Sequence, residues 1–237
     1  MLENVEPLRV FHYFENICAI PHGSGNTDGI SEFCVNFAME HGLEYKKDAL
    51  NNVIIKKAAT AGYENHPTVI LQGHLDMVCE KTADCDIDFK KDGLRLVLTG
   101  DMLSADGTTL GADDGIAVAM ILAVLEDETA AHPPLEALFT TDEETGMYGA
   151  EGVDVSALSG STLINLDSGE EGVLTVGCAG GAKADFKMPV EFCENTEPCV
   201  KITVSGLLGG HSGIDINKGR LNADTLMGRL LGGLNSE

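Results

Sequence analysis

The chain has 237 residues, of which 43% are hydrophobic, and its formal net charge is −23. This length suits one large domain, or one domain with part of another, and the apolar content is sufficient for a buried core. Nucleic-acid binding requires clustered Lys and Arg, so 15 basic residues against 38 acidic ones speak against that class of function. The acidic composition alone can also be explained by solubility, because net charge bears on solubility and not on the fold.

The cysteines and the first residues of the chain indicate in which cellular compartment the protein is expected. The seven cysteines include no C-x-x-C pair, so a structural zinc knuckle is not expected. Residues 1–6 are acidic and lack the basic start and the apolar core of a signal peptide. No apolar run reaches membrane-spanning length. We therefore expect a reduced, cytoplasmic protein with no membrane partner.

Helices and strands are predicted to alternate from the N-terminus onward. The spacing of apolar residues predicts helices over residues 7–19 and 27–42, and strands over 52–56, 67–72 and 94–98. The glycine-rich segment 21–25 interrupts the pattern between the two helices. Its His22 is a candidate ligand, although a histidine in a loop is more often simply solvated.

The strand over 67–72 ends in a histidine and an aspartate. Gly73 stops the apolar run, and His74 and Asp76 follow just beyond it. In open α/β sheets ligands bind at this carboxyl edge, and residues two apart in an extended segment point the same way. One imidazole and one carboxylate would then face a common site, the alternative being two polar residues of a loop.

Two adjacent aspartates, Asp113 and Asp114, precede an apolar helix expected over 116–125. Helix capping accounts for one of them, because Asp is favoured at N-caps and at the positive end of the helix dipole. A pair of aspartates between glycines suggests in addition a cation held between carboxylates.

Two later strands also end in acids. The strand over 135–141 leads into the run 142–144, three acids that repel one another unless a cation or a proton intervenes. A solvated acidic loop is the alternative. The strand over 162–166 leads into Asp167. Chance explains each of the four clusters singly, but it explains all four poorly.

One histidine with several carboxylates and no thiolate suits Zn, Mn or Co. A catalytic zinc keeps a position open for water, and two metals can share a bridging carboxylate and hydroxide. A general base must still take the proton of the water, and adjacent glutamates could act as ligand and base. Asp76 is either a ligand itself or the carboxylate that orients His74. The residue types predict a metal-dependent hydrolase but leave its substrate open.

The four motifs, in this order, resemble those of the dinuclear-zinc peptidases that include carboxypeptidase G and carnosinase. Further matches are similar to one branch, the aminoacyl-histidine dipeptidases, and lie at residues 20–22, 58–62, 71–78, 108–115 and 176–181. The resemblance implies an α/β fold with a mixed central sheet flanked by helices, the zinc-peptidase catalytic domain, plus the start of an α+β lid domain.

The resemblance also implies a role for each site residue. The metal ligands would be His74 and Asp167 on one ion, Glu144 on the other, and Asp113 bridging both. Glu143 would be the general base and acid, and Asp76 would tune His74 or its metal. The peptide bond after the bridging aspartate is usually cis in this family, so we expect a cis bond between Asp113 and Asp114.

A lid histidine belongs to the same implied site. His211, in a glycine-rich turn, matches the family's lid histidine, which reaches the active site of a partner subunit and helps to hold the developing oxyanion. Without the resemblance, His211 would be taken as an ordinary turn residue.

The implied domains are residues 1–182, the N-terminal part of the catalytic domain, and 183–237, the beginning of an inserted lid or dimerisation domain. Within the latter, strands are expected over 186–192 and 200–204 and a helix over 221–231. Because family members are more than twice as long, the sequence is expected to be an N-terminal fragment that lacks the final metal-binding histidine and is weakly active or inactive alone.

The implied activity is that of a metallopeptidase. It would hydrolyse dipeptides, Xaa-His and others, by a metal-activated water with a Glu general base and two divalent metal ions, zinc or else cobalt or manganese. The full-length protein would be a cytoplasmic homodimer. The alternatives are an amino-acid deacylase or tripeptidase on the same scaffold, an inactive fragment, or a metal- or peptide-binding protein without catalysis.

Overall fold

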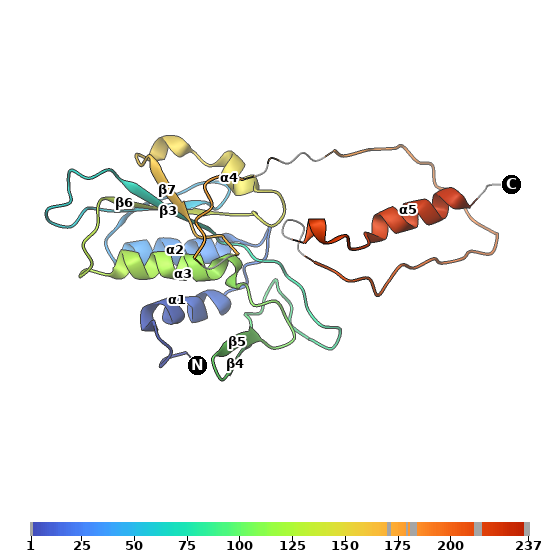
Figure 1. Cartoon of the computed structure of the whole chain (residues 1–237), viewed down its shortest axis with the longest axis horizontal. Helices are drawn as coiled ribbons and strands as arrows, with labels where there is room; N and C mark the ends of the chain where they lie inside the picture. Colours follow the sequence, from blue (N-terminus) through green and yellow to red (C-terminus); the bar gives the residue numbers. More distant parts are fainter. Residues whose placement is uncertain (1, 170–171, 179, 181–183, 211–214, 235–237) are drawn as a thin grey trace. The chain divides into compact units, whose positions relative to one another are not determined.

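A computed structural model describes residues 2–169, 172–178, 180, 184–210 and 215–234. The chain divides into two units, Met1–Cys178 and Ala179–Glu237, and each is described by itself. The first unit holds a mixed sheet with helices on both faces (Figure 1). The predicted class, an α/β fold with a mixed central sheet flanked by helices, is confirmed.

The central sheet has five strands in the order β1-β2-β6-β3-β7. Their bounds are β1 Glu44–Lys47, β2 Val53–Lys57, β3 Val69–His74, β6 Leu135–Thr140 and β7 Thr162–Asn165. β1, β2 and β6 pair antiparallel, whereas β3 runs parallel to both β6 and β7. Three parallel strands therefore end at one edge of the sheet. Two further strands, β4 (Leu96–Thr99) and β5 (Met102–Ala105), form a separate antiparallel pair.

Three helices lie on one face of the sheet, α1 (Leu8–Cys18), α2 (Asp28–Glu40) and α3 (Ala112–Glu126). α2 packs against β1 and β2, α3 packs against β3, and α1 packs on α3. The core between these layers is closed by large, fully buried side chains, among them Phe14, Ile17, Ile30, Ile55, Leu122 and Phe139. Burial of each such side chain contributes roughly 1.5–3 kcal/mol before entropy is counted, so this layer anchors the sheet.

The opposite face of the sheet is covered more thinly. Ile54, Ile70 and Leu138 form a small cluster there against the segment that carries α4 (Tyr148–Gly152) and η1 (Val155–Ala157). Glu136 of β6 lies on the same strand as Leu138, and its side chain is 3% exposed. Its carboxylate accepts hydrogen bonds from the backbone N–H groups of Ser159 and Gly160, which fixes the chain just before β7.

The second unit contains η2 (Ile216–Lys218) and α5 (Ala223–Gly233), which confirms the helix predicted near 221–231. The side chain of Asn222 caps α5 by accepting the N–H of Thr225 at 2.8 Å. The strands predicted over 186–192 and 200–204 are wrong, since these described residues are irregular. A strand needs a neighbour for its backbone hydrogen bonds, and no such neighbour occurs in the part of this unit that the structure describes. No helix among the described residues is long and apolar enough to cross a membrane.

Candidate metal centre

The parallel strands bring three of the acidic clusters to one edge of the sheet. His74, the last residue of β3, is paired in register with Thr140, the last residue of β6. On the other side of β3, Gln72 is in register with Asn165, which ends β7. The acidic run 142–144 and Asp167 follow these strand ends directly, so they lie beside the imidazole.

The fourth cluster comes from the start of α3. Gly111 precedes it in the left-handed region, with φ 68°, and a side chain at this position would meet the sulfur of Met77 at 2.8 Å. Asp113 and Asp114 are non-helical although they lie inside α3. The peptide bond between them is cis, as predicted.

Neither aspartate caps α3, whose N-cap is Gly111 with no side-chain cap, so the capping interpretation is wrong. Asp114 is 2% exposed, and its Oδ2 accepts the backbone N–H of His74 at 3.1 Å. A side chain on Gly73 would lie 2.8 Å from the same oxygen, so only glycine leaves room for this contact. Burial, together with the neighbouring Asp167 and Asp113, raises the pKa of Asp114 to about 7, although His74 opposes the shift. The two aspartates thus have different environments, one beneath the site and one within it.

His74 is oriented by its Nδ1, which lies 2.9 Å from the backbone oxygen of Asp76. A carbonyl oxygen can only accept, so Nδ1 carries a proton and Nε2 is the atom offered to the site. Nε2 lies 3.1 Å from Asp113 Oδ1 and 3.9 Å from Asp167 Oδ2. Burial opposes protonation, yet the surrounding carboxylates raise the pKa of His74 to about 10. The negative charge of the carboxylates around His74 favours the protonated imidazole, and the same negative charge would favour a bound metal cation.

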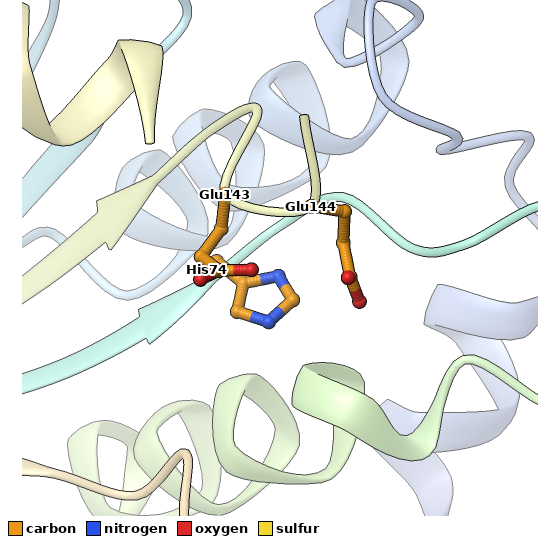
Figure 2. A group of neighbouring side chains, drawn as sticks. All are labelled: His74, Glu143 and Glu144. Carbon is orange, nitrogen blue, oxygen red and sulfur yellow. The ribbon is translucent and has the colours of Figure 1, made fainter. Parts of the chain in front are cut away.

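Two groups of side chains in the described residues could hold a metal ion, and His74 is in both. One joins it to Glu143 and Glu144, and the other to Asp113 and Asp167. Within each group the potential ligand atoms all lie within 4.8 Å of one another. Figure 2 shows His74 at the end of β3, with both glutamate side chains reaching toward it from the loop after β6. These oxygen and nitrogen donors suit Zn, Mn or Co, so the residues fit the divalent cations that the sequence implied.

Asp76 is in neither group, and its side chain is 0% exposed. Its Oδ1 accepts the backbone N–H of Glu143 at 3.1 Å, and its Oδ2 accepts that of Glu144 at 3.3 Å. Burial would raise the pKa of Asp76, but hydrogen bonds from His74, Ser24 and the N–H of Glu143 lower it overall. Asp76 is thus an ionised carboxylate that holds the backbone of the acidic loop.

The two glutamates are partly buried and have similar surroundings. Burial comes first in raising the pKa of Glu143, followed by Asp167, Asp76 and Asp113, while His74 opposes the shift. Burial and Asp113 likewise raise the pKa of Glu144. Both side chains lie close to His74, so the assignment of Glu144 as ligand and Glu143 as base stays a prediction.

Two further histidines were named from the sequence, His22 and His211. His22 is 3% exposed, and its Nδ1 lies 2.6 Å from the backbone oxygen of Ile20, so it is neither solvated nor part of the two groups. His211 lies outside the described residues.

Sequence reasoning missed three polar contacts that shape the site. The oxygens of Asp114 and Asp142 accept backbone N–H groups, from His74 and Gly25 respectively, and the hydroxyl of Ser24 donates to Asp76. Ser24 and Gly25 lie in the segment that was singled out only for His22. Its glycines and serine indicate a turn, and nothing local in them points to a partner far along the chain.

No protein-family model matches the chain. It is 44% identical over 236 residues to the cytosol non-specific dipeptidase of Escherichia coli, a match that covers 98% of this chain and 48% of that protein. It is also similar to the crystal structure of the aminoacylhistidine dipeptidase from Vibrio alginolyticus, with a TM-score of 0.75 and 38% identity over 99% of this chain and 48% of that one.

A tripeptidase from Staphylococcus aureus shares the fold, with a TM-score of 0.57 and 22% identity over 68% of this chain and 43% of its own. The chain spans about half the length of the two dipeptidases that it matches. In sequence and in fold, this chain is therefore similar to the aminoacyl-histidine dipeptidases over about half of their length, which confirms the resemblance inferred from its motifs.

Proposed function

We propose that the protein carrying this sequence is a metal-dependent dipeptidase that hydrolyses Xaa-His and other dipeptides. The observation that carries the proposal is the convergence of His74 and four carboxylates on the edge where β3, β6 and β7 end. The two relatives named as dipeptidases support the substrate class.

The chain's own residues would hold two divalent metal ions, zinc or else cobalt or manganese. His74 and Asp167 would hold one ion, Glu144 the other, and Asp113 both. When bound, such ions act as Lewis acids that lower the pKa of a water and polarise the scissile carbonyl. The buried Nδ1 contact of His74 keeps its Nε2 directed at the site, so the imidazole needs no reorientation to serve as a ligand.

Glu143 would move the proton. Its carboxyl has a raised pKa, which suits a group that takes a proton from water and later returns it to the leaving amine. Its backbone N–H is held by Asp76, so this contact and the contact of Glu144 with the same carboxylate fix the two glutamates relative to each other. Asp76 would position both glutamates as well as His74.

Further proposals rest on the resemblance alone. His211 would help to hold the oxyanion in the active site of a partner subunit, within a cytoplasmic homodimer. Residues 1–182 would be part of the catalytic domain, and 183–237 would begin the lid.

The test uses the whole natural protein that carries these 237 residues. Its metal content would be measured together with hydrolysis of a panel of Xaa-His dipeptides, other dipeptides, tripeptides and N-acylated amino acids. We expect two metals per chain and cleavage of dipeptides. Cleavage confined to N-acylated amino acids or tripeptides would replace the proposed substrate class, and a metal-free protein without hydrolysis would refute the proposal.

A further inference from the structure

The loop between α1 and α2 is fastened to the chain that follows β3. Gly23 forms an isolated parallel bridge with Met77, and the backbone N–H of Met77 donates to the carbonyl of His22 at 3.1 Å. A side chain on Gly23 would lie 2.4 Å from the sulfur of Cys79, so the loop approaches the chain after β3 as closely as glycine allows. Ser24 and Gly25 are thereby held beside Asp76 and the acidic run 142–144.

Ser24 completes the hydrogen bonding of Asp76. Its hydroxyl donates to Asp76 Oδ2 at 2.7 Å, the shortest of the three contacts from Ser24, Glu143 and Glu144 to this carboxylate. Oδ2 is shared between the hydroxyl of Ser24 and the backbone N–H of Glu144. All three donors bind an ionised acceptor, which makes such bonds roughly twice as strong as neutral ones, and the hydroxyl makes the shortest of them, so it helps to fix the rotation of the carboxylate.

The next residue of the loop holds the other end of the acidic run. The backbone N–H of Gly25 donates to Asp142 Oδ1 at 2.6 Å. Both residues are in the left-handed region, with φ 74° at Gly25 and φ 55° at Asp142. The glutamates are therefore held at two points by one loop, through Asp142 before them and through Asp76 beneath them.

We propose that Ser24 is a positioning residue for the reaction: through Asp76 it sets the orientation of Glu143 and Glu144. This inference rests on the proposed function, because it assigns Ser24 a part in the geometry of that site. Without the hydroxyl, Asp76 keeps the backbone N–H groups of Glu143 and Glu144 and the imidazole of His74, whose Nδ1 lies 3.5 Å from Oδ1, but Oδ2 loses its shortest contact and the carboxylate can rotate. The proton-transfer carboxylate and its neighbour then lose their fixed relation to His74, which lowers turnover more than substrate binding.

The test compares Ser24→Ala, Ser24→Thr and Ser156→Ala in the whole natural protein loaded with Co²⁺. Ser156 is the matched control, because its hydroxyl donates to Asp154 at 2.6 Å on an exposed surface. We expect Ser24→Ala to lower kcat about tenfold while KM stays within about twofold, and to shift the Co²⁺ absorption spectrum. Ser24→Thr, which keeps the hydroxyl, should recover most of kcat and the original spectrum, and Ser156→Ala should match the unaltered protein.

Unchanged kcat and spectrum in Ser24→Ala would overturn the inference alone, with the proposed function intact. So would a loss that Ser24→Thr fails to recover while both variants melt at lower temperature, because a purely structural serine predicts that pattern. If Ser24→Ala does not fold, Ser24→Cys, with its weak thiol donor, takes its place under the same criteria. If the unaltered protein neither binds Co²⁺ nor cleaves dipeptides, the proposed function fails and this inference fails with it.

Discussion

The buried carboxylate of Asp114 accepts the backbone N–H of His74, a residue 40 positions earlier in the chain, at 3.1 Å. This contact ties the start of α3 to the end of β3 directly beneath the imidazole. It also explains why the second aspartate of the pair is buried while the side chain of Asp113 is 66% exposed.

Asp114→Ala should destabilise the first unit by about 1–3 kcal/mol, because it leaves the buried N–H of His74 without an acceptor. Asp114→Asn keeps an oxygen at this position and should lose less. Urea unfolding in the presence of a chelator checks this, since metal release cannot then contribute to the difference. Equal free energies of unfolding for Asp114→Ala and the unaltered protein would show that this hydrogen bond does not contribute to stability.

Glu143→Gln and Glu144→Gln should have different effects although the residues are adjacent. Loss of the general base lowers kcat by about 10²–10⁴-fold, with metal content retained. Loss of a ligand should instead lower the metal content, and activity should fall with it. Elemental analysis and steady-state kinetics on both variants decide the matter, and loss of metal in Glu143→Gln would mean that the two roles are interchanged.

Divalent metal should stabilise the fold through His74. Addition of Co²⁺ or Zn²⁺ at about 100 times Kd should increase the free energy of unfolding by about 2.7 kcal/mol, and a chelator should reverse the gain. His74→Ala should reduce the response, because it removes a ligand of one of the two ions, while His66→Ala, at an exposed position, should retain it in full. Thermal unfolding with and without metal measures both.

The same binding should weaken in acid. The pKa of His74 in the metal-free protein is raised to about 10, so a metal must displace a proton from the imidazole at neutral pH. Each displaced proton makes the affinity fall about tenfold per pH unit as the pH decreases. Calorimetry in buffers of different ionisation enthalpy would detect the released proton, and a Kd that does not change between pH 6 and 8 would contradict the prediction.

Glu136 should contribute stability that is lost in acid. Burial opposes its ionisation, but hydrogen bonds from Gly160 and Ser159, together with Lys56, lower the pKa of Glu136 below its ordinary value of 4.5. A lowered folded-state pKa means that the stabilisation is complete above 4.5 and disappears as the pH falls through the folded-state value.

Glu136→Gln should therefore destabilise the protein by about 1–3 kcal/mol at pH 7 and flatten the loss of stability below pH 4.5. Glu151→Gln, at an exposed position, is the control and should change neither the free energy of unfolding at pH 7 nor its decrease in acid. Urea unfolding at a series of pH values gives both quantities. An unchanged acid slope in Glu136→Gln would show that another carboxylate is responsible.

The sequence allowed the edge of the site to be predicted because strand ends are local features. The apolar runs before His74, Glu143 and Asp167 each end where the structure ends a strand or just after, and parallel strands share an edge. The hydrogen bonds that fix the site, by contrast, join residues that are far apart in the sequence. Ser24 and Asp76 are 52 positions apart, and Gly25 and Asp142 are 117 apart, so no periodicity within one segment contains them.

The two strands that were predicted wrongly, over 186–192 and 200–204, also show that contacts distant in the sequence decide the structure. Alternating apolar residues over 186–192 measure a preference for extended backbone, whereas a strand exists only with a partner. The strands that were predicted in the first unit have partners among the described residues, as β6 has in β3, whereas the short strands β1 and β5 were not predicted although they are paired with β2 and β4.

The parallel register of β3, β6 and β7 has a consequence for folding. The potential ligand atoms come from four segments spread between His74 and Asp167, so no short stretch of the unfolded chain can assemble them. Contacts of such sequence separation form only when the loops between them have closed. Metal binding at this edge is therefore a probe of the completed sheet: a population of molecules in which β7 has not yet docked beside β3 would not contain the His74–Asp113–Asp167 group.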